Sequence, residues 1–231
     1  MIMKPYHRKY IFVSMIVLLT ALSDAYANEK EYILGIEIGN VAETYGKKAV
    51  KLVKKWCSLM EKNTKKKDKR KMTKINDFVN YIEMQSDIDN YGQVDYWATP
   101  LELLGRNRGD CEDFSITKYF SLSLMGIPVD KLRITYVMAL DYQQAHIVLA
   151  YYSKPNSDPL ILDNLNTWVL PASKRPDLKP IYGFNGDFIW KSKTGSKDVK
   201  VDRSSMPRMS NQFKQWDALL LRMKKAIGKS K

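Results

Sequence analysis

The chain has 231 residues, and its 45% hydrophobic and 27% charged content is typical of a globular protein of about one domain. Two cysteines are too few for a disulfide-stapled scaffold, so a core of its own must stabilise the protein. The 38 Lys and Arg residues exceed the 25 Asp and Glu residues, and the formal net charge of +13 leaves nucleic acid, membrane surfaces and acidic partners open as ligands.

The first 27 residues have the three parts of a secretory signal. Basic residues precede a short apolar run at Ile11–Leu22, and Ala25-Tyr26-Ala27 is a small-x-small cleavage site. The alternative is a retained anchor, but the apolar run is shorter than the ~20 residues that a transmembrane helix needs. We therefore predict a signal peptide at 1–27 and a single exported, non-spanning domain at 28–231, in which His146 is the one remaining histidine.

Helices are predicted for the first part of this domain. Apolar residues recur at helical spacing over 41–60, with lysines between them, and a second helix is predicted at 73–85. The basic segment 61–71 has no core residues, so we expect a solvated loop or a frayed helix there. Residues 86–109 are rich in turn formers and contain one short predicted helix at 100–104.

The second part of the domain begins with a helix and continues with strands. The helix is predicted at 111–125, opened by Asp110 and ended by Gly126. The β-branched and aromatic runs that follow predict strands at 132–140, 145–152, 160–163, 181–184 and 188–190. A last amphipathic helix is predicted at 210–226. Helices followed by a sheet predict an α+β fold.

Three residues in these elements could form a nucleophile, a base and an orienting acid. Cys111 falls in the first turn of its helix, where free N–H groups and the helix dipole favour a thiolate. His146 could act as general base, and Asp163, which ends the next strand, could orient its imidazole. Each residue also has an ordinary explanation, as an apolar filler, a core histidine and a turn residue. Together, however, they follow the Cys–His–Asp order of papain-like and transglutaminase-like folds.

Acidic residues flank the thiol, namely Asp110, Glu112 and Asp113. Their negative charge opposes ionisation of Cys111, which calls for an explanation. One interpretation is that Asp110 caps the helix and that the other two are first-turn acids favoured by the helix dipole. The other is that the carboxylates hold a hard cation such as Ca²⁺, which fixes the turn that carries the nucleophile.

Two further features receive ordinary interpretations. Residues 87–92 mimic the start of an EF-hand loop, but Ala98 stands where the bidentate carboxylate is needed, so we reject an EF-hand. Cys57 lies in the apolar phase of the first helix and is predicted to be a buried structural thiol. A disulfide between Cys57 and Cys111 stays open in an oxidising compartment, although it would silence the nucleophile.

The surplus of lysine is interpreted mainly as a solvated surface. It is concentrated in segment 61–71 and in the tail 224–231, and neither of these contains an aromatic residue. Single-stranded nucleic-acid binding would require aromatic side chains among the basic ones, or a known module. We therefore predict no nucleic-acid partner and keep acidic partners or lipid head groups as the alternatives.

The motifs together resemble one family, the LapG-type bacterial transglutaminase-like cysteine proteinases. The resemblance covers about residues 75–190 and is carried by Asp95–Glu102, Gly109–Phe114, Lys118–Phe120, Leu132–Val137, Ala145–Tyr152 and Leu162–Leu165. The Gly-Asp-Cys-Glu-Asp run with the downstream Ala-His and Leu-Asp-Asn is far more specific than a lone Cys/His pair. One departure is Ile147, where Met is expected, and segment 61–71 matches nothing in the family pattern.

The resemblance implies a periplasmic, Ca²⁺-dependent cysteine endopeptidase with a papain-like or transglutaminase-like fold. In that case Cys111 is the nucleophile, His146 the base and Asp163 its orienting partner. The calcium ligands implied are Asp110, Glu112 and Asp113. The implied substrate is a large surface adhesin, cut near its N-terminus between two small residues to release cells from a biofilm. An inner-membrane, cyclic-di-GMP-responsive receptor of the LapD type is implied as the regulator.

Two other classes of function remain compatible with the residues. A transglutaminase or amidase could use the same Cys–His–Asp acyl transfer and would pass the acyl group to an amine or act on a side-chain amide. A non-catalytic binding module could keep the fold without the chemistry, and its Cys111 would then react no faster than an ordinary free thiol.

Overall fold

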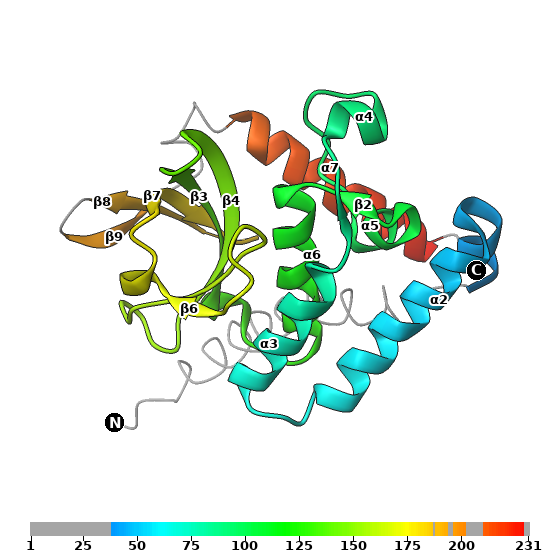
Figure 1. Ribbon diagram of the computed structural model, residues 1–231, viewed down its shortest axis with the longest axis horizontal. Coiled ribbons are helices and arrows are strands. Elements are labelled where there is room, and N and C mark those ends of the chain that lie inside the picture. The colour runs from blue at the N-terminus through cyan, green and yellow to red at the C-terminus, as the bar shows by residue number, and fades with distance from the viewer. Residues whose placement is uncertain (1–37, 187, 194–195, 202–209, 229–231) are drawn as a thin grey trace, which may run out of the picture.

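The computed structural model describes residues 38–186, 188–193, 196–201 and 210–228, so the predicted signal peptide at 1–27 lies outside the described residues. Figure 1 shows helices gathered on one side of the molecule and a curled sheet on the other, with helix α6 (Cys111–Leu124) between them. The combination of a helical half and an antiparallel sheet confirms the predicted α+β class.

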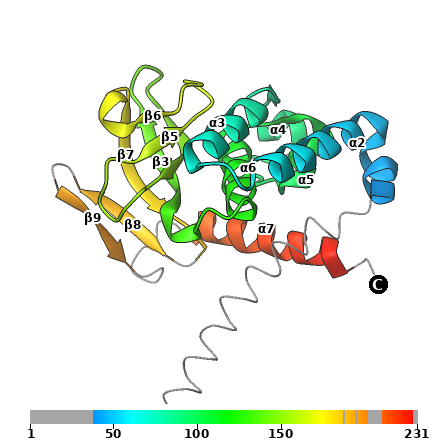
Figure 2. The same ribbon diagram turned by 90° about the horizontal axis from the view of Figure 1, so that it is seen from below.

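The helices other than α6 are α2 (Ile38–Asn63), α3 (Asp68–Val79), α4 (Asp87–Tyr91), α5 (Pro100–Arg106) and α7 (Ser210–Gly228). α2 follows the apolar pattern predicted for its middle, and Trp56 Nε1 donates to Ser121 Oγ of α6 at 2.9 Å. α7 runs along one side of the molecule (Figure 2) and stacks Trp216 on Phe120 of α6. Within the described part of the chain, no helix has the length and apolar character needed to cross a membrane.

One antiparallel sheet has the strand order β6-β5-β4-β3-β7-β8-β9. Its strands are β3 (Leu132–Ala139), β4 (Gln144–Tyr151), β5 (Leu160–Leu162), β6 (Leu170–Pro171), β7 (Leu178–Phe184), β8 (Ile189–Lys193) and β9 (Ser196–Val201). In β4, Ile147 belongs to the main core shared with the helices, whereas Val148 joins a smaller cluster on the other face. This alternation is that of a strand with apolar groups on both sides.

Helix α6 is the buried centre of the molecule. Every residue from Asp113 to Ser123 is buried, because the helix is enclosed by other helices and by the sheet. At its end, Gly126 has a φ of 84°, and the Ile127 N–H donates to the Leu122 carbonyl at 3.0 Å. This is a Schellman motif, which needs a left-handed residue and therefore favours glycine. The predicted end of the helix at Gly126 is confirmed.

The basic segment 61–71 differs in part from the prediction of a solvated loop or frayed helix. Its first residues continue α2 and its last ones begin α3, with a short exposed turn between them. Lys71 is buried, and its Nζ donates to the Met125 carbonyl, beyond the end of α6, at 2.7 Å. The lysine thereby satisfies a carbonyl that the helix leaves without an intrahelical partner.

The turn-rich region 86–109 is more ordered than predicted. The short helix expected at 100–104 is present as α5, and its capping box between Thr99 and Glu102 explains where it begins. The helix predicted at 73–85 instead ends at Val79, because the next residues form β1 (Glu83–Met84), which pairs in parallel with β2 (Arg108–Gly109). This pairing brings the start of α4 close to the start of α6.

Replacing Lys71 with Met should lower the free energy of unfolding by about 2 kcal/mol, because the Met125 carbonyl loses a charge-assisted hydrogen bond. Lys69→Met is the matched control, since Lys69 is exposed on the same helix and should change stability little. Urea unfolding followed by circular dichroism measures both variants. Equal stability of the two variants would show that the buried contact contributes nothing.

Candidate active site

Cys111 is the first residue of α6 and follows β2 directly, so its thiol lies at the helix N-terminus. Its Sγ donates to Glu112 Oε2 at 2.8 Å, and the backbone N–H of Ile147 points toward the sulfur. Burial raises the pKa of the thiol well above its usual value, and the negative charge of Glu112 raises it further. In this arrangement the thiol is held protonated by its acidic neighbour.

His146 and Asp163 form a buried pair on neighbouring strands. His146 lies near the start of β4 and is 3% exposed, and its Nε2 is 2.7 Å from Asp163 Oδ1. Because Nε2 faces the carboxylate, Nδ1 is the ring nitrogen left for proton exchange with a reacting group. The backbone N–H groups of Asn164 and Leu165 also donate to Asp163 Oδ1, which fixes the position of the carboxylate.

Arg175 completes the surroundings of Asp163. Its Nη2 donates to Asp163 Oδ2 at 2.6 Å and to Asp177 Oδ2 at 2.7 Å. Burial alone would raise the pKa of Asp163, but the hydrogen bond and charge of His146, together with the Arg175 guanidinium, lower it below its usual value. The carboxylate therefore stays ionised and can hold the imidazole in one orientation.

Helix α6 and strand β4 are joined beside the candidate nucleophile. Ser115, one turn after Cys111, donates its hydroxyl to the Ile147 carbonyl at 3.1 Å. The Ile147 N–H faces the Cys111 sulfur, so both backbone polar groups of Ile147 are directed at α6. Since Ile147 follows His146 directly, this packing brings the thiol and the imidazole to the same end of the sheet.

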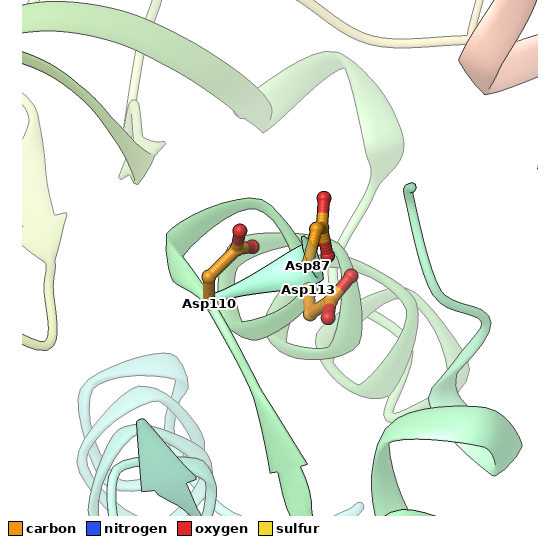
Figure 3. A group of neighbouring side chains, drawn as sticks. All are labelled: Asp87, Asp110 and Asp113. Atoms are coloured by element: carbon orange, nitrogen blue, oxygen red, sulfur yellow. The ribbon is translucent and has the colours of Figure 1, made fainter. Parts of the chain in front are cut away.

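Three aspartates gather on the other side of the nucleophile. Asp87 begins α4, Asp110 precedes α6 and Asp113 lies in its first turn, and each offers an oxygen within 4.8 Å of the other two. Figure 3 shows their carboxyl groups lying close together. Asp110 occupies the N-cap position, but its side chain makes no capping hydrogen bond. Glu112 lies outside this group, with its carboxylate on the thiol.

The three carboxyl groups are electrostatically unsatisfied. Burial raises the pKa of Asp87 to about 6, and burial together with the charge of Glu112 raises the pKa of Asp110 to about 8. Burial and the neighbouring Asp110 also raise the pKa of Asp113. Among the described residues, one oxygen of each aspartate has no hydrogen-bond partner. Converging, buried oxygen ligands without partners are suited to a hard divalent cation.

Gly109 and Ala98 hold the deepest of these acids in place. The Ala98 N–H donates to Asp113 Oδ1 at 2.6 Å. A Cβ on Gly109 would lie 2.6 Å from Asp113 Oδ2 and 2.5 Å from Leu103 Cδ1, which is too close for any side chain. The glycine of the Gly-Asp-Cys-Glu-Asp run is therefore needed for the close packing of the strand on the first turn of α6.

The structure places the predicted site residues in two neighbouring groups, and it places two further residues beside them. Cys111 lies beside the strand that carries the His146–Asp163 pair, and Asp110 and Asp113 lie together, whereas Glu112 faces the thiol. Arg175 and Asp87 were not among the predicted site residues. The acidic pattern of residues 87–92 was the signal in the sequence for Asp87. These residues do not match an EF-hand loop, but Asp87 lies in an acidic cluster with Asp110 and Asp113. Arg175 has no motif signal, because only folding places it on Asp163.

The second cysteine is not joined to the first. Cys57 and Cys111 are both free thiols, and Cys57 is half-buried in α2, where burial raises its pKa. The possible disulfide between them is therefore absent from this structure. The prediction of a buried structural thiol at Cys57 holds only in part, because Cys57 is half-buried.

Comparison with known proteins identifies close relatives. Residues 50–177 match the model of a family described as bacterial transglutaminase-like cysteine proteinase, a range that includes Cys111, His146, Asp163 and Arg175. A structure of Legionella pneumophila LapG treated with EGTA is 40% identical, covers 81% of this chain and 98% of that chain, and has a TM-score of 0.68. A calcium-bound structure of the same Legionella protein is 40% identical over 80% of this chain and 97% of that chain, with a TM-score of 0.66. No curated protein matches the chain.

Replacing Arg175 with Met should destabilise the protein by about 3 kcal/mol, because it leaves the Asp163 carboxylate buried without its cationic partner. Asp177→Asn is the matched control, since it removes the other, partly exposed partner of Arg175 and should cost much less. Thermal unfolding near pH 7 measures both. A melting temperature of Arg175→Met equal to that of Asp177→Asn would contradict the assigned role.

Proposed function

We infer the function from one premise: the chain belongs to the bacterial transglutaminase-like cysteine proteinases and is a cysteine peptidase. Its fold is the transglutaminase-like cysteine protease fold that the sequence predicted. On this premise we propose that the protein is a periplasmic, calcium-dependent endopeptidase. We further propose that it cuts a large surface adhesin near its N-terminus and thereby releases cells from a biofilm.

One observation supports the proposed chemistry above all others, namely the helix N-terminal Cys111 packed against the strand of the buried His146–Asp163 pair. A peptidase of this class needs a thiol nucleophile, a base and a group that holds the base. Arg175 adds the charge that keeps Asp163 ionised. These four residues account for nucleophile, proton transfer and orientation without any further group from the described chain.

The proposed reaction is acyl transfer to water through a thioester. The Cys111 thiol gives its proton to His146 Nδ1 and the sulfur attacks the peptide carbonyl carbon, forming the S–C bond. Breaking of the C–N bond follows as His146 returns the proton to the leaving amine. Water, deprotonated by the same imidazole, then attacks the thioester, releases the carboxylic acid and restores the thiol. The Cys111 backbone N–H, at the start of the helix, is the proposed first oxyanion donor.

The three clustered aspartates fit a calcium ion. All the ligand atoms they offer are carboxylate oxygens, Asp87 and Asp113 are buried and Asp110 is half-buried, and among the described residues each has an oxygen without a hydrogen-bond partner. We propose Asp87, Asp110 and Asp113 as ligands. Glu112, which the family pattern also predicts, would join them only by turning its carboxylate away from the Cys111 thiol. A bound calcium ion would neutralise the negative charge beside the thiol. The acids would then hold the first turn of α6 in one conformation.

The proposed location and regulation rest on the family resemblance and the N-terminal sequence. Residues 1–27 are the proposed signal peptide, which would export the enzyme to the periplasm and leave it unanchored. The proposed regulator is a LapD-type inner-membrane receptor that responds to cyclic di-GMP and restrains the enzyme. The proposed cleavage site lies between two small residues, such as Ala-Ala, in the adhesin's N-terminal region.

Replacing Cys111 with Ala should abolish cleavage of an N-terminal fragment of a candidate adhesin from the same bacterium, because no thioester can form. Cys57→Ala is the matched control and should cleave at the wild-type rate. Mass spectrometry of the fragment before and after incubation with calcium reports both the cut and its position. Undiminished cleavage by Cys111→Ala would sink the proposed mechanism. Incorporation of a labelled amine in place of cleavage would favour a transglutaminase.

Replacing Asp87 with Asn should weaken calcium binding by about tenfold or more, since affinity at such sites follows the number of ligand charges. The matched control is Asp89→Asn, which alters an exposed carboxylate of the same short helix. Isothermal titration calorimetry measures the affinity. The calcium affinity of the wild-type protein should also fall from pH 8 to pH 6, because Asp110, with a pKa of about 8, takes up a proton in competition with the ion. Wild-type affinity in Asp87→Asn would remove this residue from the site.

A further inference from the structure

Lys118 is a buried lysine that the proposed reaction does not use. It lies seven residues after Cys111 in α6, and Ser115 lies between them at the i+4 position, so the three share one face of the helix. That face is turned to β4, because the Ser115 hydroxyl binds the Ile147 carbonyl. Side chains in a helix lean toward its N-terminus, so the Lys118 chain leans toward the end that carries Cys111.

Among the described residues, the amine of Lys118 has no hydrogen-bond partner. The side chain is 0% exposed. The charges that act on it are that of the Asp163 carboxylate and, once the thiol is ionised, that of the Cys111 sulfur. Burial lowers the pKa of Lys118 to about 7, and the negative charge of those two groups opposes the decrease.

An unpaired amine in the core is unfavourable for stability. A methionine of similar length would fill the same space without the cost of burying a polar group. The nearby carboxylate does not need the lysine, because Asp163 already binds Arg175, His146 and two backbone N–H groups. The position of the amine is therefore not explained by the packing or by a salt bridge.

We propose that Lys118 is a positioning residue of the peptidase reaction, whose buried amine, in its protonated form, supports from the core side of α6 the negative charge carried by Asp163 and developed on the Cys111 sulfur. This inference rests on the proposed Cys111–His146–Asp163 group. Because no carboxylate in the described part of the chain forms an ion pair with this amine, the positive charge of its protonated form acts on the reacting groups. It also opposes the negative field of the acids at the helix N-terminus.

The test compares Lys118→Met with Thr117→Val, both in the calcium-loaded full chain. Thr117 is the matched control, since its hydroxyl is also buried in α6 and has no hydrogen-bond partner among the residues that the structure describes. It lies one residue away but on a different face of the helix. The first readout is the rate of iodoacetamide alkylation at Cys111, with Cys57 in the same chain as internal reference. The second is the melting temperature, and the third is kcat and KM on a cleaved peptide.

In Lys118→Met the Cys111 alkylation rate and kcat should fall about tenfold, the size expected for one charge acting across a protein interior. KM and the Cys57 rate should stay unchanged, the melting temperature should stay equal or rise, and Thr117→Val should react as wild type. Wild-type alkylation and kcat in Lys118→Met would overturn the proposal. So would a fall in activity matched by a fall in melting temperature, because it would assign a structural role.

Lys118→Gln serves if the methionine variant does not fold, and failure of both to fold would also overturn the proposal in favour of a structural role. Alkylation of Cys111 needs no substrate, so this readout tests the role of Lys118 even if the proposed adhesin substrate is wrong. A wild-type enzyme that leaves every adhesin fragment intact would reject the proposed substrate. The comparison of Cys111 reactivity between the Lys118 and Thr117 variants would still decide the role of the lysine.

Discussion

The hydrogen bond from Ser115 of α6 to the Ile147 carbonyl of β4 joins the two elements on which the proposed chemistry depends. It attaches the helix that carries the thiol to the strand that carries the imidazole, one residue from His146 and one turn from Cys111. A helix in a packed core cannot slide by a fraction of a turn without disturbing its neighbours. The burial of α6 from Asp113 to Ser123 therefore holds the nucleophile where the sheet presents the base.

Electrostatic forces at the site are arranged in two opposing groups. On the side of α4, the carboxyl groups of Asp87, Asp110 and Asp113 crowd together, and the negative charges of Glu112 and Asp110 disfavour a thiolate. On the side of the sheet, Arg175 and the buried Lys118 favour negative charge. The proposed calcium ion would shift this balance by neutralising the first group. This offers a physical reason for a cysteine peptidase to depend on a cation that need not touch its substrate.

Some features were predictable from the sequence because their signals are local. Gly126 follows an apolar helix and ends it, and Cys111, His146 and Asp163 each stand at the boundary or within a strongly patterned element. Other features depend on contacts between distant segments. Asp87 joins the acidic cluster only because β1 pairs with β2, and Lys71 is buried only because α3 packs against the end of α6. A run of lysines carries no sign of which member will be covered.

Cys111, activated by the His146–Asp163 pair, is the proposed group that attacks a peptide carbonyl. A peptidyl chloromethyl ketone ending in Ala-Ala tests this role most directly, because it reacts only where a nucleophile and a substrate-shaped site coincide. After incubation with calcium, peptide mapping by mass spectrometry should find one adduct, on Cys111, and His146→Ala should lose it. An adduct on Cys57 alone, or an equal adduct on Cys111 in His146→Ala, would contradict the account.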